Sequence, residues 1–173
     1  MRLFIALPLP EAGRAQVSAY LTRLRKAGAA GNFTRPVNLH MTMAFLGEQP
    51  DPARAEAALE RLSFRRFPYV LNRLDRFRQR DSELLYLGPD RNERFQALAA
   101  ALWRELKAEG FQPENRRFTA HLTLCRELRN AEAASRLPPP EVAAEAEELI
   151  LYLSSRVNGV LTYTPLARQP AAD

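Results

Sequence analysis

The chain has 173 residues, of which 46% are hydrophobic, and carries a formal net charge of +5. This length suits one compact domain or two small fused lobes with an adequate core. No apolar run approaches the roughly 20 residues that span a bilayer, the start of the chain is unlike a secretory signal, and the single Cys125 has no disulfide partner. We therefore expect a cytoplasmic protein without a membrane segment.

The first half of the chain alternates strand and helix signals. A strand is predicted at residues 3–7, and a helix follows from residue 10 or 11 to about residue 26. A second strand is predicted at 38–46, a helix at 55–62, and a further strand at 67–77.

The second half opens with the same order of elements. We predict a strand, a helix, a strand and a short helical turn at residues 84–87, 92–109, 118–125 and 130–136, respectively. Two closing strands, 147–157 and 160–166, are joined through Asn158 and Gly159, which is a strong hairpin signal. The tail from Ala167 is expected to fray.

The only two histidines each stand two residues before a threonine, as His40 with Thr42 and His121 with Thr123. Because side chains alternate between the faces of a strand, each pair projects from one side. Two such strands facing one cleft would bring together two imidazoles and two hydroxyls. This combination predicts an acid/base site for a phosphate group, and with so few histidines and cysteines we expect neither a metal nor a cofactor.

The two motifs belong to a predicted internal repeat. The histidines are 81 positions apart, and the same offset aligns the apolar strands Leu3–Pro8 and Leu84–Pro89 without a gap. We predict one domain over residues 1–173, with a repeat over roughly 2–47 and 83–128. The predicted fold class is α+β, with two pseudo-symmetric lobes whose antiparallel sheets surround a central cleft and whose helices lie outside. Symmetry requires one histidine to be the acid and the other the base, but does not say which.

Arginine supplies 23 of the 25 basic residues. Its planar guanidinium suits bidentate contacts with phosphate. Clusters occur at residues 65–66, 73–80 and 116–117, and they are interpreted either as contacts for RNA or as ordinary solvated faces.

The chain resembles the two-histidine phosphoesterase superfamily, in particular its bacterial branch of RNA 2′,3′-cyclic phosphodiesterases, also named 2′-5′ RNA ligases. The resemblance runs over nearly the whole chain and centres on the segments Asn38–Glu48 and Phe118–Arg126. Two positions depart from the family pattern: Ala120 stands where proline is common, and Cys125 where alanine is frequent.

The resemblance implies hydrolysis of a terminal 2′,3′-cyclic phosphate, on RNA or on a cyclic nucleotide, to a 2′-phosphate. Carried onto this chain, it makes His40 the proton donor and His121 the acceptor, with Thr42 and Thr123 holding the phosphate. Arg126 matches a family arginine near the nucleotide. Strand alternation places Arg126 opposite His121, so this match requires a bend in the strand.

Phe4 is the remaining candidate for substrate binding. Its strand can direct it toward the cleft, where an aromatic ring could stack a base, or it can simply fill the core. Two alternative functions stay open: joining of RNA ends such as tRNA halves through a 2′-5′ bond, and non-catalytic binding of RNA ends or nucleotides through Phe4, Arg126 and the arginine clusters. The expected partners are RNA with 2′,3′-cyclic phosphate ends or cyclic nucleotides, with no membrane and no obligate protein partner.

Overall fold

The computed structural model describes all residues, 1–173. Nine strands form one antiparallel sheet in the order β7-β4-β5-β6-β3-β1-β8-β9, and β2 pairs with β6 outside this path. The strands are β1 (Arg2–Pro8), β2 (Ala30–Phe33), β3 (His40–Glu48), β4 (Phe67–Arg78), β5 (Glu83–Pro89), β6 (Leu122–Arg129), β7 (Val142–Ala146), β8 (Glu148–Val157) and β9 (Val160–Pro170). The helices are α1 (Glu11–Lys26), α2 (Ala53–Arg61), α3 (Glu93–Ala108) and α4 (Ala131–Ser135), with a 3-10 turn at Pro36–Asn38.

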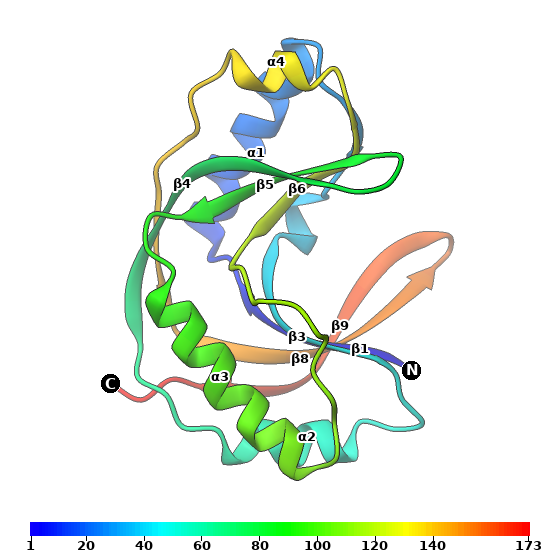
Figure 1. Cartoon of the computed structure of the whole chain (residues 1–173), viewed down its shortest axis with the longest axis vertical. Helices are drawn as coiled ribbons and strands as arrows, with labels where there is room; N and C mark the ends of the chain where they lie inside the picture. The colour runs from blue at the N-terminus through cyan, green and yellow to red at the C-terminus, as the bar shows by residue number, and fades with distance from the viewer.

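The sheet is curled, and the helices cover its outside. Figure 1 shows α1 and α4 at one end of the molecule and α2 and α3 at the other. The apolar faces of the helices and the alternate apolar residues of the strands form one continuous core. The predicted α+β fold with antiparallel sheet and outer helices is thus confirmed. No helix is both long and apolar enough to cross a membrane.

The two motif strands are neighbours at the centre of the sheet. β3 pairs with β6 in antiparallel orientation, with Met41 opposite Leu122. Both residues are almost completely buried. Because these apolar residues fix one face of each strand against the core, the histidines and threonines beside them project from the other face.

The register of the two units differs from the prediction. Ala6 pairs with Thr42, and Tyr86 pairs with Thr123. The motifs are 81 positions apart, whereas Ala6 and Tyr86 are 80 positions apart, so the gap-free alignment is wrong for the first strand of each unit. A slip of one residue exchanges the two faces of a strand. The position beside the threonine is therefore alanine in one unit and tyrosine in the other.

Three further expectations need correction. The strand predicted at 118–125 begins only at Leu122 and runs to Arg129, so His121 stands just before it. The strands β2 and β7 were not predicted, because both are short and depend on pairing with distant segments. The tail does not fray: β9 continues to Pro170 against β8, and the Ala172 N–H donates to the carbonyl of Phe64. Long-range backbone hydrogen bonds, which local patterns do not report, decide each of these cases.

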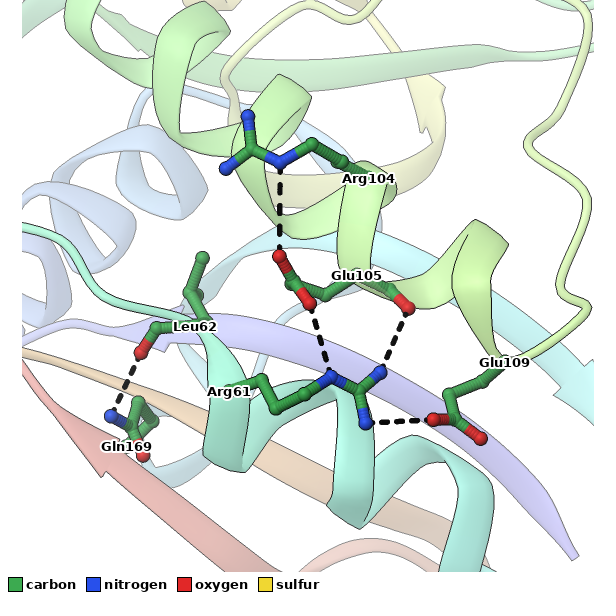
Figure 2. Close-up of polar contacts among 6 residues, drawn as sticks. All are labelled: Arg61, Leu62, Arg104, Glu105, Glu109 and Gln169. Carbon is green, nitrogen blue, oxygen red and sulfur yellow. Dashed lines mark hydrogen bonds and ion pairs between the residues drawn. The ribbon is translucent and has the colours of Figure 1, made fainter.

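Polar contacts join α2 to α3 where the two helices pack together (Figure 2). Arg61 at the end of α2 lies with Nε 3.1 Å from Glu105 Oε2 and with Nη1 2.7 Å from Glu109 Oε1. Its Nη2 also donates to the Glu105 carbonyl at 3.4 Å. The next residue, Leu62, accepts a 2.8 Å hydrogen bond from Gln169 of β9. The end of α2 is therefore attached both to α3 and to the last strand.

Gly31 in β2 provides a test of the unpredicted β2–β6 pairing. Its φ is +146°, and a Cβ built there would lie 2.7 Å from both the Arg126 carbonyl oxygen and Cys125 Sγ. We expect Gly31→Ala to lower the free energy of unfolding by roughly 2 kcal/mol or more, measured by urea denaturation. Gly159→Ala is the matched control, because Gly159 also has a positive φ, +78°, but no atom lies within 4 Å of its Cβ position. Equal losses in the two variants would contradict the close approach at Gly31.

Candidate active site

Both histidine rings are held in the same way. His40 Nδ1 lies 2.6 Å from the backbone oxygen of Asn38, and His121 Nδ1 lies 2.8 Å from that of Thr119. A carbonyl oxygen can only accept, so Nδ1 carries a proton in both rings. In the neutral imidazole Nε2 is then the acceptor. Nε2 is therefore the ring nitrogen of each histidine that can accept a proton.

The threonines complete a diagonal arrangement. His40 Nε2 lies 3.0 Å from Thr42 Oγ1, so the hydroxyl donates to the neutral ring. Continuing the antiparallel register from the Met41–Leu122 pair places His40 across from Thr123 and Thr42 across from His121. The structure thus brings the four motif side chains to one face, with the histidines at opposite corners.

A β-bulge explains how Arg126 reaches this face. Tyr86 pairs with Thr123 but the preceding Leu85 pairs with Cys125, so β6 contains one extra residue at Leu124. Leu124 and Cys125 are both buried, and Arg126 is exposed. Because a bulge reverses the alternation of the residues that follow it, Arg126 returns to the side of Thr123. The bend that the family match required is this bulge.

β3 carries an equivalent bulge. Thr42 pairs with Ala6, whereas Ala44 pairs with the preceding Ile5, which leaves Met43 as the extra residue. Phe45 therefore turns toward the motif face, and it stands 81 positions before Arg126. The two units place a phenylalanine and an arginine at equivalent points.

A groove of about 520 Å³ opens beside His40. No Asp or Glu is among the residues that line it, which are Arg2, Phe4, His40, Thr42, Phe45, Arg126, Ser154, Ser155, Arg156, Leu161 and Tyr163. A groove with three arginines and no acid favours an anionic ligand.

Aromatic rings pack around each imidazole. The His40 ring centroid is 5.1 Å from that of Phe4 and 5.2 Å from that of Tyr163. His121 has Phe77 at 5.0 Å and Tyr86 at 5.5 Å, both edge-on. These contacts restrict rotation of both imidazoles.

Phe4 packs against His40 and is only 4% exposed. Its ring also packs on Tyr152 and Tyr163, with centroids 5.3 and 4.9 Å away. The structure thus shows Phe4 supporting the His40 ring, while stacking of a base on Phe4 stays a prediction.

Sequence reasoning missed several supporting residues. Asn38 is buried, and its Nδ2 donates to the Leu161 carbonyl at 3.1 Å. Asn38, whose own carbonyl holds the His40 ring, is thereby attached to β9. Its place two residues before His40 was a usable signal. An alignment of the first strands with an offset of 80 instead of 81 would have placed Tyr86 beside Thr123, as Ala6 is beside Thr42. Phe77 comes from β4, whose pairing with β5 the sequence did not reveal. Tyr163 lies in the predicted closing hairpin, but the hairpin signal does not show that its ring packs on His40.

Burial is the main cause of a lowered pKa in both imidazoles of the free protein. The pKa of His40 is lowered to about 4, mainly by burial and also by the charges of Arg126 and His121, while the hydrogen bond to the Asn38 carbonyl opposes this shift. The pKa of His121 is likewise lowered, first by burial and then by Arg126 and Arg116, against the effect of the Thr119 carbonyl. Both histidines are therefore neutral at pH 7, in agreement with protonation at Nδ1 alone.

Known proteins resemble this chain in sequence and in fold. A sequence model of the 2′-5′ RNA ligase superfamily matches residues 11–160. The chain belongs to this superfamily. The prediction of the two-histidine family from the sequence is confirmed.

The relatives match over most of their length. An RNA 2′,3′-cyclic phosphodiesterase of Escherichia coli (strain K12) is 35% identical over 175 residues, which cover 96% of this chain and 94% of the relative. One from Thermotoga maritima is 29% identical and covers 84% of this chain and 83% of the relative. A crystal structure of E. coli LigT complexed with 3′-AMP superposes with a TM-score of 0.82 at 29% identity, covering 99% of this chain and 98% of that one.

The effects of nearby arginines on the pKa values of His40 and His121 can be separated by NMR titration of the Cε1–H groups of the two rings. Both should titrate below 6.5, with His40 near pH 4. Because Arg126 lowers both pKa values, Arg126→Gln should raise both. Arg116→Gln is the control, since Arg116 acts on His121 and not on His40. A His40 pKa that is unchanged in the Arg126 variant would contradict this electrostatic arrangement.

Proposed function

We propose that this protein hydrolyses the terminal 2′,3′-cyclic phosphate of RNA to a 2′-phosphomonoester, with two histidines as acid and base. The observation that carries the proposal is the pair of imidazoles on one face. Each ring is fixed by the hydrogen bond from Nδ1 to a backbone carbonyl, which leaves Nε2 as the nitrogen that exchanges a proton with the substrate or water. The names of the curated relatives and the 3′-AMP bound by LigT support a cyclic phosphate on a nucleotide as the substrate.

His121 acts as the general base in this proposal. Its neutral Nε2 takes a proton from a water molecule as the water oxygen forms a bond to phosphorus. The bond from phosphorus to O3′ breaks, and His40 donates the proton on Nε2 to that oxygen. The diagonal placement of the two histidines suits attack and departure on opposite sides of the phosphate, as in-line displacement requires.

Substrate binding prepares His40 for its role as acid. In the free protein burial and the charge of Arg126 oppose protonation of His40. A bound phosphodiester anion is attracted to Arg126 and favours the imidazolium, so it raises the His40 pKa toward neutrality. The Thr42 hydroxyl, which donates to His40 Nε2 in the free protein, turns to a phosphate oxygen and releases that nitrogen.

Thr42, Thr123 and Arg126 hold the phosphate. Two hydroxyls and a guanidinium directed at the non-bridging oxygens stabilise the additional negative charge of the transition state. Joining of RNA ends would use the same groups with a 5′-hydroxyl in place of water. The curated relatives carry the name of the hydrolytic reaction, which supports hydrolysis.

Replacement of either histidine tests the assignment. We expect His40→Ala and His121→Ala each to lower kcat/KM on a short RNA with a 2′,3′-cyclic phosphate end by about 10²- to 10⁴-fold, because each removes one proton transfer. Thermal unfolding of each variant serves as the folding control. Full activity in both variants would overturn the proposal, and a 3′-phosphate product would overturn the assignment of O3′ as leaving group.

The absence of a metal from the mechanism has its own test. Since every catalytic step uses an imidazole, turnover by the wild-type protein in excess EDTA should equal turnover without it. Adding Mg²⁺ or Zn²⁺ back should change nothing. Loss of activity in EDTA that is restored by either cation would show that a metal takes part.

A further inference from the structure

The hairpin of β8 and β9 extends the groove away from His40. Tyr152 of β8 lies beside Phe4, then Ser154 pairs with Tyr163, and nearer the turn Arg156 pairs with Leu161. Figure 1 shows the end of this hairpin projecting beyond the rest of the sheet, clear of the helices. Since Ser154 and Arg156 share a face with Tyr163, which touches His40, this face continues the active-site surface outward. We call Arg2, Phe45, Ser154, Arg156 and Leu161 the hairpin strip.

Four of the six exposed large hydrophobic residues lie in the strip or at the turn of the hairpin. Phe45 and Leu161 belong to the strip, and Val157 and Val160 flank the hairpin turn. The complete set of exposed large hydrophobic residues is Met1, Val37, Phe45, Val157, Val160 and Leu161. Exposed apolar groups gathered in one place mark a binding surface more often than chance.

The arginines of the strip lack acidic partners. Arg2 lies over the Phe45 ring at 5.0 Å, and Arg156 donates to the Gly159 carbonyl at 3.1 Å. Neither forms an ion pair with a carboxylate, as is true of most arginines in this chain, but these two line the groove, and no acidic residue lines it with them. Uncompensated guanidinium groups interleaved with apolar side chains match a single strand of nucleic acid, whose phosphates alternate with bases.

The opposite wall is less suited to a phosphate chain. Beside His121, Asp75 faces the site and accepts a hydrogen bond from the Tyr86 hydroxyl at 3.4 Å. The Phe77 and Tyr86 rings stack on each other, with centroids 4.4 Å apart. Asp75 repels phosphate and offsets the charge of Arg73 on the same wall. The stacked rings of Phe77 and Tyr86 already cover one face of each other.

We propose that the hairpin strip binds the nucleotides on the 5′ side of the terminal cyclic phosphate in single-stranded RNA. This inference rests on the proposed function for its direction. If His40 protonates O3′, the terminal ribose lies on the His40 side of the phosphate, and its 5′ carbon leads to the preceding nucleotide. Arg2 and Arg156 then contact the upstream phosphates, and Phe45 and Leu161 contact the upstream bases. The substrate class is thus an RNA end of several nucleotides.

Binding of reaction products tests the strip without requiring turnover. Calorimetry compares a tetranucleotide that carries a terminal 2′-phosphate with the corresponding nucleoside 2′-phosphate. We expect the tetranucleotide to bind the wild-type protein at least about tenfold more tightly, with a steeper salt dependence. The double variant Arg156→Gln/Leu161→Ser should remove most of this difference and leave the mononucleotide affinity within about twofold.

Controls separate the strip from general charge effects. The hydrogen bonds from Arg35 and Asn38 go to the backbone carbonyl of Leu161, so the side-chain change leaves them in place. Arg156→Gln alone should reduce the salt slope by about 0.7, the value for one phosphate contact to a single strand. Arg73→Gln removes a charge from the opposite wall and should leave the affinity ratio unchanged.

Equal affinity for the tetranucleotide and the mononucleotide would overturn the inference, as would loss of the tetranucleotide preference in Arg73→Gln but not in the double variant. The proposed function fails in a different way. If the wild-type protein prefers the tetranucleotide through the strip but hydrolyses no cyclic phosphate, the binding surface is supported and the proposed reaction is refuted.

Discussion

The site depends on the antiparallel pairing of β3 with β6 at the centre of the sheet. One backbone register, fixed by Met41 opposite Leu122, sets the relation between the two histidines and the two threonines. The hydrogen bond from each Nδ1–H to a carbonyl two residues earlier then fixes the ring and its tautomer. Backbone pairing thus sets the relation between the motifs, and backbone carbonyls hold the two imidazole rings, so the fold itself orients the site.

The symmetric motifs stand in asymmetric surroundings. The equivalent bulges expose Phe45 in one unit and Arg126 in the other, and the neighbour of the threonine is Ala6 in one and Tyr86 in the other. The β8–β9 hairpin adjoins only the unit of His40. In the proposed reaction, these different surroundings are the physical basis for giving the two imidazoles opposite roles.

Much of the fold followed from local patterns, and what failed was long-range. Both ends of the helix Glu11–Lys26, both ends of β8 and the start of β9 were predicted within one residue. Helical spacing and an Asn-Gly turn are local signals, so the sequence reports them directly. The strands β2 and β7 and the attached tail were missed, since each is stabilised by partners far along the chain. Strand alternation alone placed Arg126 on the face opposite His121. This was wrong because the bulge at Leu124 reverses the alternation, and the pattern of residues gives no sign of the bulge.

The sequence by itself determined the four motif side chains, the placement of His40, Thr42 and Thr123 on strands, and the family to which the chain belongs. Alternation along a strand and a repeated motif are properties of the chain alone. Tertiary structure decided the diagonal arrangement of the histidines, the return of Arg126 to the site, the aromatic rings around each imidazole and the groove beside His40. These depend on register and bulges, which arise when strands compete for hydrogen-bond partners across the folded sheet.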